Sequence, residues 1–169
     1  MTSVSNTMIT KAGVAIVKKI GGVWHGLVVL QSGSSKWGFP KGSKTYMREP
    51  LHVCAKRELA EEAGLFIELS SKHQYITIHN TAYFVMEPSK ENIKLFQHLK
   101  TKDTKEIDAI SWMPIQPNST DTHHKSLIRL MELIESIPIE TLSLPPKKSL
   151  CHQCIRSKWL PTTFFQKTN

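Results

Sequence analysis

The segment from Pro50 to Gly64 constrains the fold of this chain more than any other part of its sequence. Between these two residues, Leu51 to Ala63 consists of good helix formers and contains no internal breaker. Proline suits the first helical position, and glycine suits the left-handed residue just past the last helical one. The segment therefore predicts a helix over residues 51–63 whose two ends are both marked by the sequence.

Three glutamates of this helix, Glu58, Glu61 and Glu62, are spaced so that they share one helical face. Apolar residues belong to the same stripe, so we expect these carboxylates to be partly desolvated. Like charges crowded at partial burial are unfavourable unless a cation neutralises them. Hard oxygen ligands of this kind suit Mg²⁺ or Mn²⁺. The three residues alone leave an alternative open, in which the glutamates of an exposed helix pair with Arg57 or Lys56.

The remaining segments alternate between strand and helix patterns. Apolar runs and turn residues predict the following elements: two strands within Ile9–Leu30, strands at Tyr75–Ile78, Thr81–Met86 and Ile107–Trp112, and a second helix at Asp121–Ile137. Residues 91–100 fit either a short helix or a loop. Several strands with two separated helices predict an α/β fold, in which a sheet lies between helices.

Length and cysteine content limit the class of protein. A chain of 169 residues can form one domain with a short appendage, and it has no run of eighteen apolar residues. Its first residues lack the charged flank and apolar core of a secretory signal. Three cysteines leave at least one thiol unpaired, which fits a reducing compartment. We therefore expect a cytoplasmic protein without a membrane span.

Positive charge is concentrated at the end of the chain. Lysine and arginine exceed aspartate and glutamate by 22 − 14 = 8, and no acidic residue follows Glu140. We therefore divide the chain into a domain at residues 1–140 and a basic extension at residues 141–169. The extension contains these basic and aromatic residues: Lys147, Lys148, Trp159, Arg156, Lys158, Phe164, Phe165 and Lys167. It could contact the phosphates of a nucleic acid and stack bases, or it could be a solvated tail or pack on the domain.

A longer pattern around the glutamates resembles a known family. Glu49 is followed after seven residues by Arg57-Glu58-Leu59-x-Glu61-Glu62-x-Gly64-Leu65. This pattern resembles the signature of the Nudix hydrolases, which cleave diphosphate linkages attached to a further group X. One departure is present, because six residues separate Gly42 from Glu49, one more than the family usually has.

The resemblance covers about residues 9 to 137 and carries expectations for fold and site. It implies the Nudix α/β/α sandwich, with a mixed sheet and a signature that forms a loop, a helix and a loop. It also implies that Glu58, Glu61 and Glu62 bind Mg²⁺ or Mn²⁺, with Glu61 and Glu62 acting in catalysis as well. Glu49 and Arg57 would brace the loop against the helix.

A further carboxylate often follows on a later loop or strand of the family, and Glu106 occupies the matching place. It is expected to be a general base or an additional metal ligand; the alternative is an exposed glutamate at a strand edge. The implied reaction is metal-assisted hydrolysis of a phosphoanhydride, in which a glutamate accepts a proton from the attacking water. Catalysis of this kind depends mainly on positioning and electrostatics.

A narrower resemblance concerns the substrate. The run Trp37-Gly38-Phe39-Pro40-Lys41-Gly42, together with Cys54-Ala55-Lys56-Arg57-Glu58, is similar to the mRNA-decapping Nudix enzymes. It favours hydrolysis of the 5′ cap of mRNA, with release of a nucleoside diphosphate. Hydrolysis of dinucleoside polyphosphates, nucleotides or diphosphoinositol polyphosphates is the alternative. A binding module without turnover is a third possibility, which the intact glutamates argue against.

Individual side chains in these runs have simple expected roles. Lys41 and Gly42 are expected to bind substrate phosphate, although Lys41 could equally be a surface lysine. Trp37 and Phe39 are expected to pack beneath the loop, with stacking on the cap as the alternative, and Cys54 is expected to be a small buried residue. His123 and His124 are expected to form a solvated pair.

The pair Cys151 and Cys154 gives only half of a structural zinc site, so free thiols are favoured there over a metal. The sequence does not determine the oligomeric state.

Overall fold

The helix expected from its end signals is present in the computed structural model, which describes residues 8–96, 98–101, 104–115 and 123–145. This helix, α1, spans Leu51–Ala63 and ends at Gly64, whose φ of 65° is left-handed. Pro50 precedes the helix with φ −62° and ψ 139°, so it caps the helix instead of occupying its first position. The predicted bounds of the helix are therefore confirmed, and the placement of Pro50 was wrong by one residue.

The strand predictions are confirmed within one or two residues at most ends, and short strands are added to them. The strands are β1 (Lys11–Ile20), β2 (Val23–Gln31), β3 (Trp37–Gly38), β4 (Lys41–Ser43), β5 (Ile76–Ile78), β6 (Thr81–Glu87), β7 (Ile107–Pro114) and β8 (Glu140–Thr141). The other helices are α2 (Lys90–Phe96) and α3 (Lys125–Leu133), which a short 3₁₀ turn follows at Ile134–Ser136. Two glycines with positive φ form the turn between β1 and β2.

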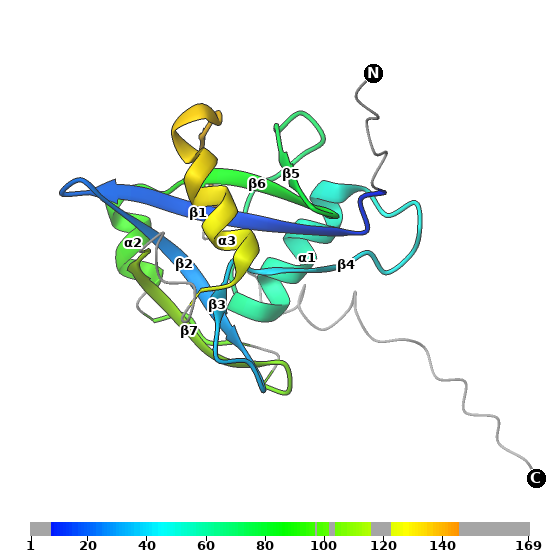
Figure 1. The fold of residues 1–169 in the computed structure, drawn as a ribbon, viewed down its shortest axis with the longest axis horizontal. Coiled ribbons are helices and arrows are strands. Elements are labelled where there is room, and N and C mark those ends of the chain that lie inside the picture. The colour runs from blue at the N-terminus through cyan, green and yellow to red at the C-terminus, as the bar shows by residue number, and fades with distance from the viewer. Residues whose placement is uncertain (1–7, 97, 102–103, 116–122, 146–169) are drawn as a thin grey trace, which may run out of the picture.

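The sheet is mixed, and its central strands diverge (Figure 1). β1 pairs in parallel with β6, and β6 pairs in parallel with β8, whereas the other pairs are antiparallel. β1 and β2 pair only through residues 17–20 and 23–26. Beyond that point β1 pairs with β4, and β2 pairs with β3. The divergence leaves space between β1 and β2 at one end of the sheet.

Helices cover both faces of the sheet, so the α/β/α sandwich is confirmed. Side chains alternate across strands β1 and β6, since successive residues of a strand point to opposite faces. One face packs against α1 through these residues: Ala12, Val14, Ile16, Ala82, Phe84, Cys54, Ala55 and Leu59. The other face packs against α3 through these residues: Ala15, Val17, Tyr83, Val85, Leu127, Leu130 and Met131. Cys54 and Phe39 are buried, as expected.

The start of α3 differs from its prediction. The helix begins at Lys125, and His124 is its N-cap. The preceding residue, His123, forms an isolated bridge with Trp37, and the amide of His124 donates to the carbonyl of Trp37 over 2.8 Å. This pairing keeps both histidines extended, so the helix cannot start at residue 121 as predicted. His123 is 3% exposed, so the solvated pair was wrong for His123, while His124 is exposed.

Packing continues beyond the predicted domain boundary at residue 140. Leu142 is buried in the core on the α1 face, and its amide donates to the carbonyl of Glu87. The amide of Glu68 donates to the carbonyl of Ser143 over 2.8 Å. The boundary therefore falls inside the packed region, and the basic residues and cysteines of the extension lie outside the described residues. No helix of the described part of the chain is long and apolar enough to cross a membrane.

Candidate active site

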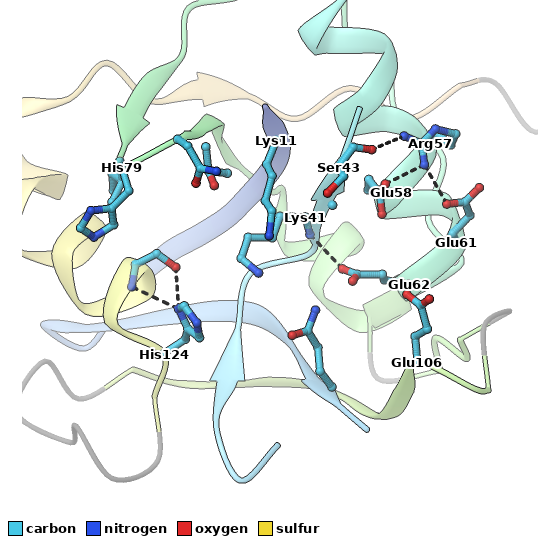
Figure 2. Close-up of a pocket in the computed structure, with 16 residues that line it drawn as sticks. Lys11, Lys41, Ser43, Arg57, Glu58, Glu61, Glu62, His79, Glu106 and His124 are labelled. Atoms are coloured by element: carbon cyan, nitrogen blue, oxygen red, sulfur yellow. Dashed lines mark hydrogen bonds and ion pairs between the residues drawn. The ribbon is translucent and has the colours of Figure 1, made fainter. Parts of the chain in front are cut away.

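A cavity of about 590 Å³ opens where β1 and β2 diverge (Figure 2). Segments distant in the sequence contribute its walls, including α1, the β5–β6 turn and the start of α3. It is lined by these residues: Lys11, Gln31, Lys41, Gly42, Ser43, Arg57, Glu58, Glu61, Glu62, Ile78, His79, Asn80, Thr81, Glu106, His124 and Ser126. The fold therefore gathers in one place most of the residues expected to bind metal or substrate.

Four carboxylates form one side of this cavity. Glu58, Glu61 and Glu62 come from the last two turns of α1, and Glu106 comes from the residue before β7. Their exposure differs widely: Glu62 is 4% exposed, Glu58 is partly buried, and Glu61 and Glu106 are exposed. Glu106 is thus both an exposed residue at a strand end and part of the cavity wall. Figure 2 shows these four side chains together on one side of the cavity.

Gly42 allows the carboxylate of Glu58 to lie directly against β4. A methyl group at this position would lie about 2.1 Å from the carboxylate of Glu58, well inside van der Waals contact. The residue on the other side of the same strand, Lys41, places its backbone amide 2.8 Å from Oε2 of Glu62 and donates to it. The strand therefore holds both carboxylates by direct contact with its backbone.

Arg57 connects the loop before α1 to the acidic side of the cavity. Its Nε donates to Oε1 of Glu49 over 3.2 Å, and its Nη2 donates to the carbonyl of Ser43 over 2.9 Å. Its Nη1 contacts carboxylate oxygens of Glu58 at 2.6 Å and of Glu61 at 3.1 Å. The alternative pairing considered from the sequence thus exists, but on a partly buried face instead of an exposed helix.

Glu49 lies behind the cavity and does not line it. It is 3% exposed, and its Oε2 accepts the amide of Thr45 over 2.7 Å. Burial would raise the pKa of Glu49, but hydrogen bonds from Arg57 and Thr45 outweigh burial and lower it. Tyr46 and Met47 of the loop before α1 are exposed, so the loop bulges outward between Gly42 and Glu49. Glu49 can therefore reach Arg57 despite the longer loop.

The environment of Glu62 disfavours its charged form. Burial raises the pKa of Glu62 to about 7, and this effect exceeds the opposing ones of the Lys41 amide and ammonium. Burial also raises the pKa of Glu58, and the charges of Glu61 and Glu106 add to the rise. The helix thus holds carboxylates close together where their mutual repulsion is poorly screened.

This shift predicts a pH-dependent stability in protein freed of metal by EDTA. Because the folded-state pKa of Glu62 lies above its ordinary value of 4.5, the folded state binds the proton more tightly than the unfolded state. The tighter proton binding by Glu62 stabilises the folded state fully below the ordinary pKa, and this stabilisation is lost as the pH rises through about 7. Between about pH 5.5 and about pH 8, the free energy of unfolding should fall by about 2 kcal/mol relative to Glu62→Gln.

Urea unfolding of the parent and of Glu62→Gln at each pH measures this difference. The exposed Glu68 provides a control, since Glu68→Gln should follow the parent at every pH. A constant difference between the parent and Glu62→Gln across this range would contradict the raised pKa.

The donor set fits a hard divalent cation. Four carboxylates supply oxygen ligands, and a bound cation would remove the repulsion that raises the pKa values of Glu58 and Glu62. Among the described residues, no three Asp, Glu, His or Cys side chains already meet as a ligand set. Instead, Glu58 and Glu61 turn toward Arg57, so metal binding requires these two carboxylates to share or leave the guanidinium.

Other cavity residues were not expected from the sequence. They come from the start of β1, the end of β2, the β5–β6 turn and the start of α3: Lys11, Gln31, His79, Asn80, His124 and Ser126. The local signal at His79-Asn80 was a turn between two predicted strands, which indicates no ligand. The pairing of β1 with β6 and the position of α3 place the residues of β1, the β5–β6 turn and α3 opposite the glutamates, whereas Gln31 of β2 lies beside Glu62.

Comparisons with known proteins agree with this architecture. The sequence model of the NUDIX domain matches residues 10–133. The "Putative hydrolase 111R" of Invertebrate iridescent virus 3 is 31% identical over 70 residues, which cover 40% of this chain and 41% of that protein. The chain therefore matches less than half the length of this curated relative.

Two solved structures are similar in fold and cover 76% of this chain. The NUDIX domain of Shewanella oneidensis NrtR, in complex with ADP ribose, has a TM-score of 0.55 at 13% identity over 87% of its chain. A C. elegans Ap4A hydrolase has a TM-score of 0.50 at 17% identity over 98% of its chain. At these identities the similarity establishes a shared fold. Since the family model matches well over half of its residues, the chain belongs to the NUDIX domain family.

Proposed function

We propose that this protein is a divalent-metal-dependent hydrolase that cleaves a diphosphate linkage. The observation that carries this proposal is the convergence of Glu58, Glu61, Glu62 and Glu106 on one cavity that lysines also line. A cluster of like charges that is partly buried reduces stability, so it is best explained by a ligand of opposite charge. The Nudix domain match is consistent with this chemistry.

Glu58, Glu61 and Glu62 are the residues we propose as ligands of Mg²⁺ or Mn²⁺, and Glu106 is either a further ligand or the general base. When bound, a divalent cation would supply charge neutralisation at the phosphate oxygens and would acidify a water molecule. Arg57 and Glu49 hold the loop and the helix together, so that β4 and the glutamates keep their relative positions. These two residues therefore have a positioning role.

The proposed reaction is a hydrolysis at one phosphorus of the linkage. The water oxygen bonds to this phosphorus while the bridging P–O bond breaks, and a glutamate accepts the proton that the water loses. Glu62, with a pKa of about 7 in the metal-free protein, and Glu106 are both candidates for this base. The ammonium of Lys41 and the backbone at Gly42 lie beside these carboxylates, where they could contact the transferred phosphate.

For the substrate, we favour the 5′ cap of mRNA, because the run from Trp37 to Gly42 and the residues from Cys54 to Glu58 are similar to those of decapping enzymes. The basic residues of the extension would then contact the RNA backbone, and the protein would act in the cytoplasm. Dinucleoside polyphosphates are the second candidate, because the cavity size suits a small nucleotide and an Ap4A hydrolase shares the fold. Nucleotides and diphosphoinositol polyphosphates share the same chemistry.

A product assay separates these substrates. Cap-labelled RNA, diadenosine tetraphosphate and a diphosphoinositol polyphosphate are each incubated with the parent protein and Mg²⁺ or Mn²⁺. If the cap is the substrate, methylated guanosine diphosphate should be released from RNA by the parent at a rate at least about a hundredfold above that of Glu62→Gln. Activity on the small molecules alone would move the assignment to the second candidate. Hydrolysis of none of the three in either metal would contradict the proposed enzyme class.

A further inference from the structure

The side of the cavity opposite the glutamates is basic. Lys11, His79 and His124 lie on that side, and Lys41 lies between them and the carboxylates (Figure 2). All Asp and Glu residues that line the described cavity belong to the other side. The cavity is therefore divided into an acidic half, which suits cations, and a basic half, which suits an anion.

The position of Lys11 and His79 is determined by backbone contacts at one end of the sheet. The carbonyl of Asn80 accepts the amides of Thr10 and Lys11 at 3.0 and 3.1 Å, and its side-chain amide donates to the hydroxyl of Thr10 over 2.8 Å. These bonds attach the β5–β6 turn to the start of β1. His79 has a φ of 55° in this turn, a left-handed conformation that non-glycine residues rarely adopt. A histidine thus occupies a position where glycine would be easier to accommodate.

His124 presents a hydrogen-bond donor on this side of the cavity. Its Nδ1 accepts the backbone amide of Ser126 at 3.3 Å and lies 2.9 Å from the Ser126 hydroxyl. Because a backbone N–H can only donate, Nδ1 is unprotonated and the neutral ring carries its proton on Nε2. The hydroxyl of Tyr83 lies 3.2 Å from that of Ser126 and supports this arrangement. His124 is therefore a fixed N–H donor at the edge of α3.

Among the described residues, the charges that shift the pKa of His124 are all positive. Partial desolvation lowers the pKa of His124, and nearby Lys41, Lys36 and Lys11 lower it further. Burial lowers the pKa of Lys41, and repulsion by Lys11 acts in the same direction, against attraction by Glu62. An anion between these groups would reduce this repulsion. It would also accept from the ammonium of Lys11 and the N–H of His124.

We propose that the basic half, formed by Lys11, His79 and His124, binds a phosphate of the substrate that lies beyond the cleaved diphosphate. The proposal rests on the proposed function and specifies its substrate class. Suitable substrates carry at least one additional phosphate near the cleaved linkage, either in a linear chain or on the ring of group X. Substrates whose diphosphate joins only groups without phosphate, such as the adenosine and ribose of ADP-ribose, leave this half of the cavity without a partner.

Binding of inorganic tripolyphosphate to the protein in EDTA tests the site without any catalysis. Calorimetry should give an affinity for the parent that falls at least about tenfold in Lys11→Met and in His124→Gln, since each loses one charged or polar contact to phosphate. His98→Gln and Lys72→Met, at exposed residues away from the cavity, should bind as the parent does. Urea unfolding of each variant verifies its fold, and Lys11→Arg should restore most of the affinity. Equal affinity in all variants would overturn the proposal.

Kinetics then distinguish the source of the phosphate. With diadenosine tetraphosphate as the linear substrate and a diphosphoinositol polyphosphate as the ring substrate, KM should rise about tenfold in His124→Gln for the substrate class that uses this half. The KM for ADP-ribose should not change. An equal rise for ADP-ribose would overturn the proposal. If the parent hydrolyses nothing while tripolyphosphate binding responds to the variants, the proposed function fails and the anion site stands.

Discussion

Glu62→Gln should lower kcat by about 10²–10⁴-fold on the preferred substrate. The substitution removes a negative charge from the acidic half of the cavity, and with it a proposed metal ligand and candidate base. It keeps an oxygen that can accept the Lys41 amide, which now donates to Oε2 over 2.8 Å. Since Glu62 is 4% exposed and its burial favours the neutral form, the metal-free variant should be at least as stable as the parent.

Steady-state kinetics with Mg²⁺ and urea unfolding in EDTA measure these two effects on one pair of proteins. Glu68→Gln is the matched control, because it makes the same chemical change at an exposed residue outside the cavity. Calorimetric titration with Mn²⁺ adds a direct measure of metal binding, which should weaken in Glu62→Gln only. A variant that retained more than about a tenth of the parent kcat would contradict the assigned role of Glu62.

The sequence predicted most of the acidic half of the cavity because three of its four carboxylates belong to one helix. Helical spacing relates Glu58, Glu61 and Glu62 directly, and the residues at each end of the helix fixed its bounds. Burial of Glu62 was also predictable, since it shares a stripe with apolar residues that pack on the sheet. Local rules sufficed here because the geometry of an α-helix determines which of its residues are neighbours.

The basic half could not be predicted, because its residues meet only through tertiary structure. Lys11 and His79 are brought together by the parallel pairing of β1 with β6 and by the turn that Asn80 attaches to β1. His124 joins them because the segment before α3 pairs with Trp37. That pairing also explains the misplaced start of α3: backbone bonds to a distant strand outweighed a helical pattern in the sequence.

The end of the domain was obscured for a similar reason. The division at residue 140 was based on charge, whereas the fold uses β8 and the buried Leu142 to extend the sheet beside β6. A strand of two residues has no periodicity that a sequence pattern could reveal. Charge composition therefore placed the division before residues that pack on the domain, and the basic extension itself stays a prediction.

Arg57→Met should lower the free energy of unfolding by about 3–5 kcal/mol. The guanidinium is the ion-pair partner of Glu49, whose carboxylate is 3% exposed and would remain buried without a counter-charge. The amide of Thr45 compensates only part of this loss. Methionine retains much of the aliphatic volume of arginine, so the expected effect comes from the lost charge and hydrogen bonds. Urea unfolding at neutral pH measures it, with Lys56→Met at the adjacent position as the control.

A double-mutant cycle distinguishes this explanation from a simple loss of packing. If the cost of Arg57→Met arises from an uncompensated Glu49, then adding Glu49→Gln should recover a large part of it, because the buried charge is removed with its partner. Strict additivity of the two substitutions would instead mean that Arg57 stabilises the fold independently of Glu49. Recovery of stability in the double variant should not restore kcat, since β4, which carries Gly42, would still lack the hydrogen bond that Arg57 donates to the carbonyl of Ser43. The double variant would then regain stability without regaining kcat. This is the result expected if Arg57 positions the site without taking part in the reaction.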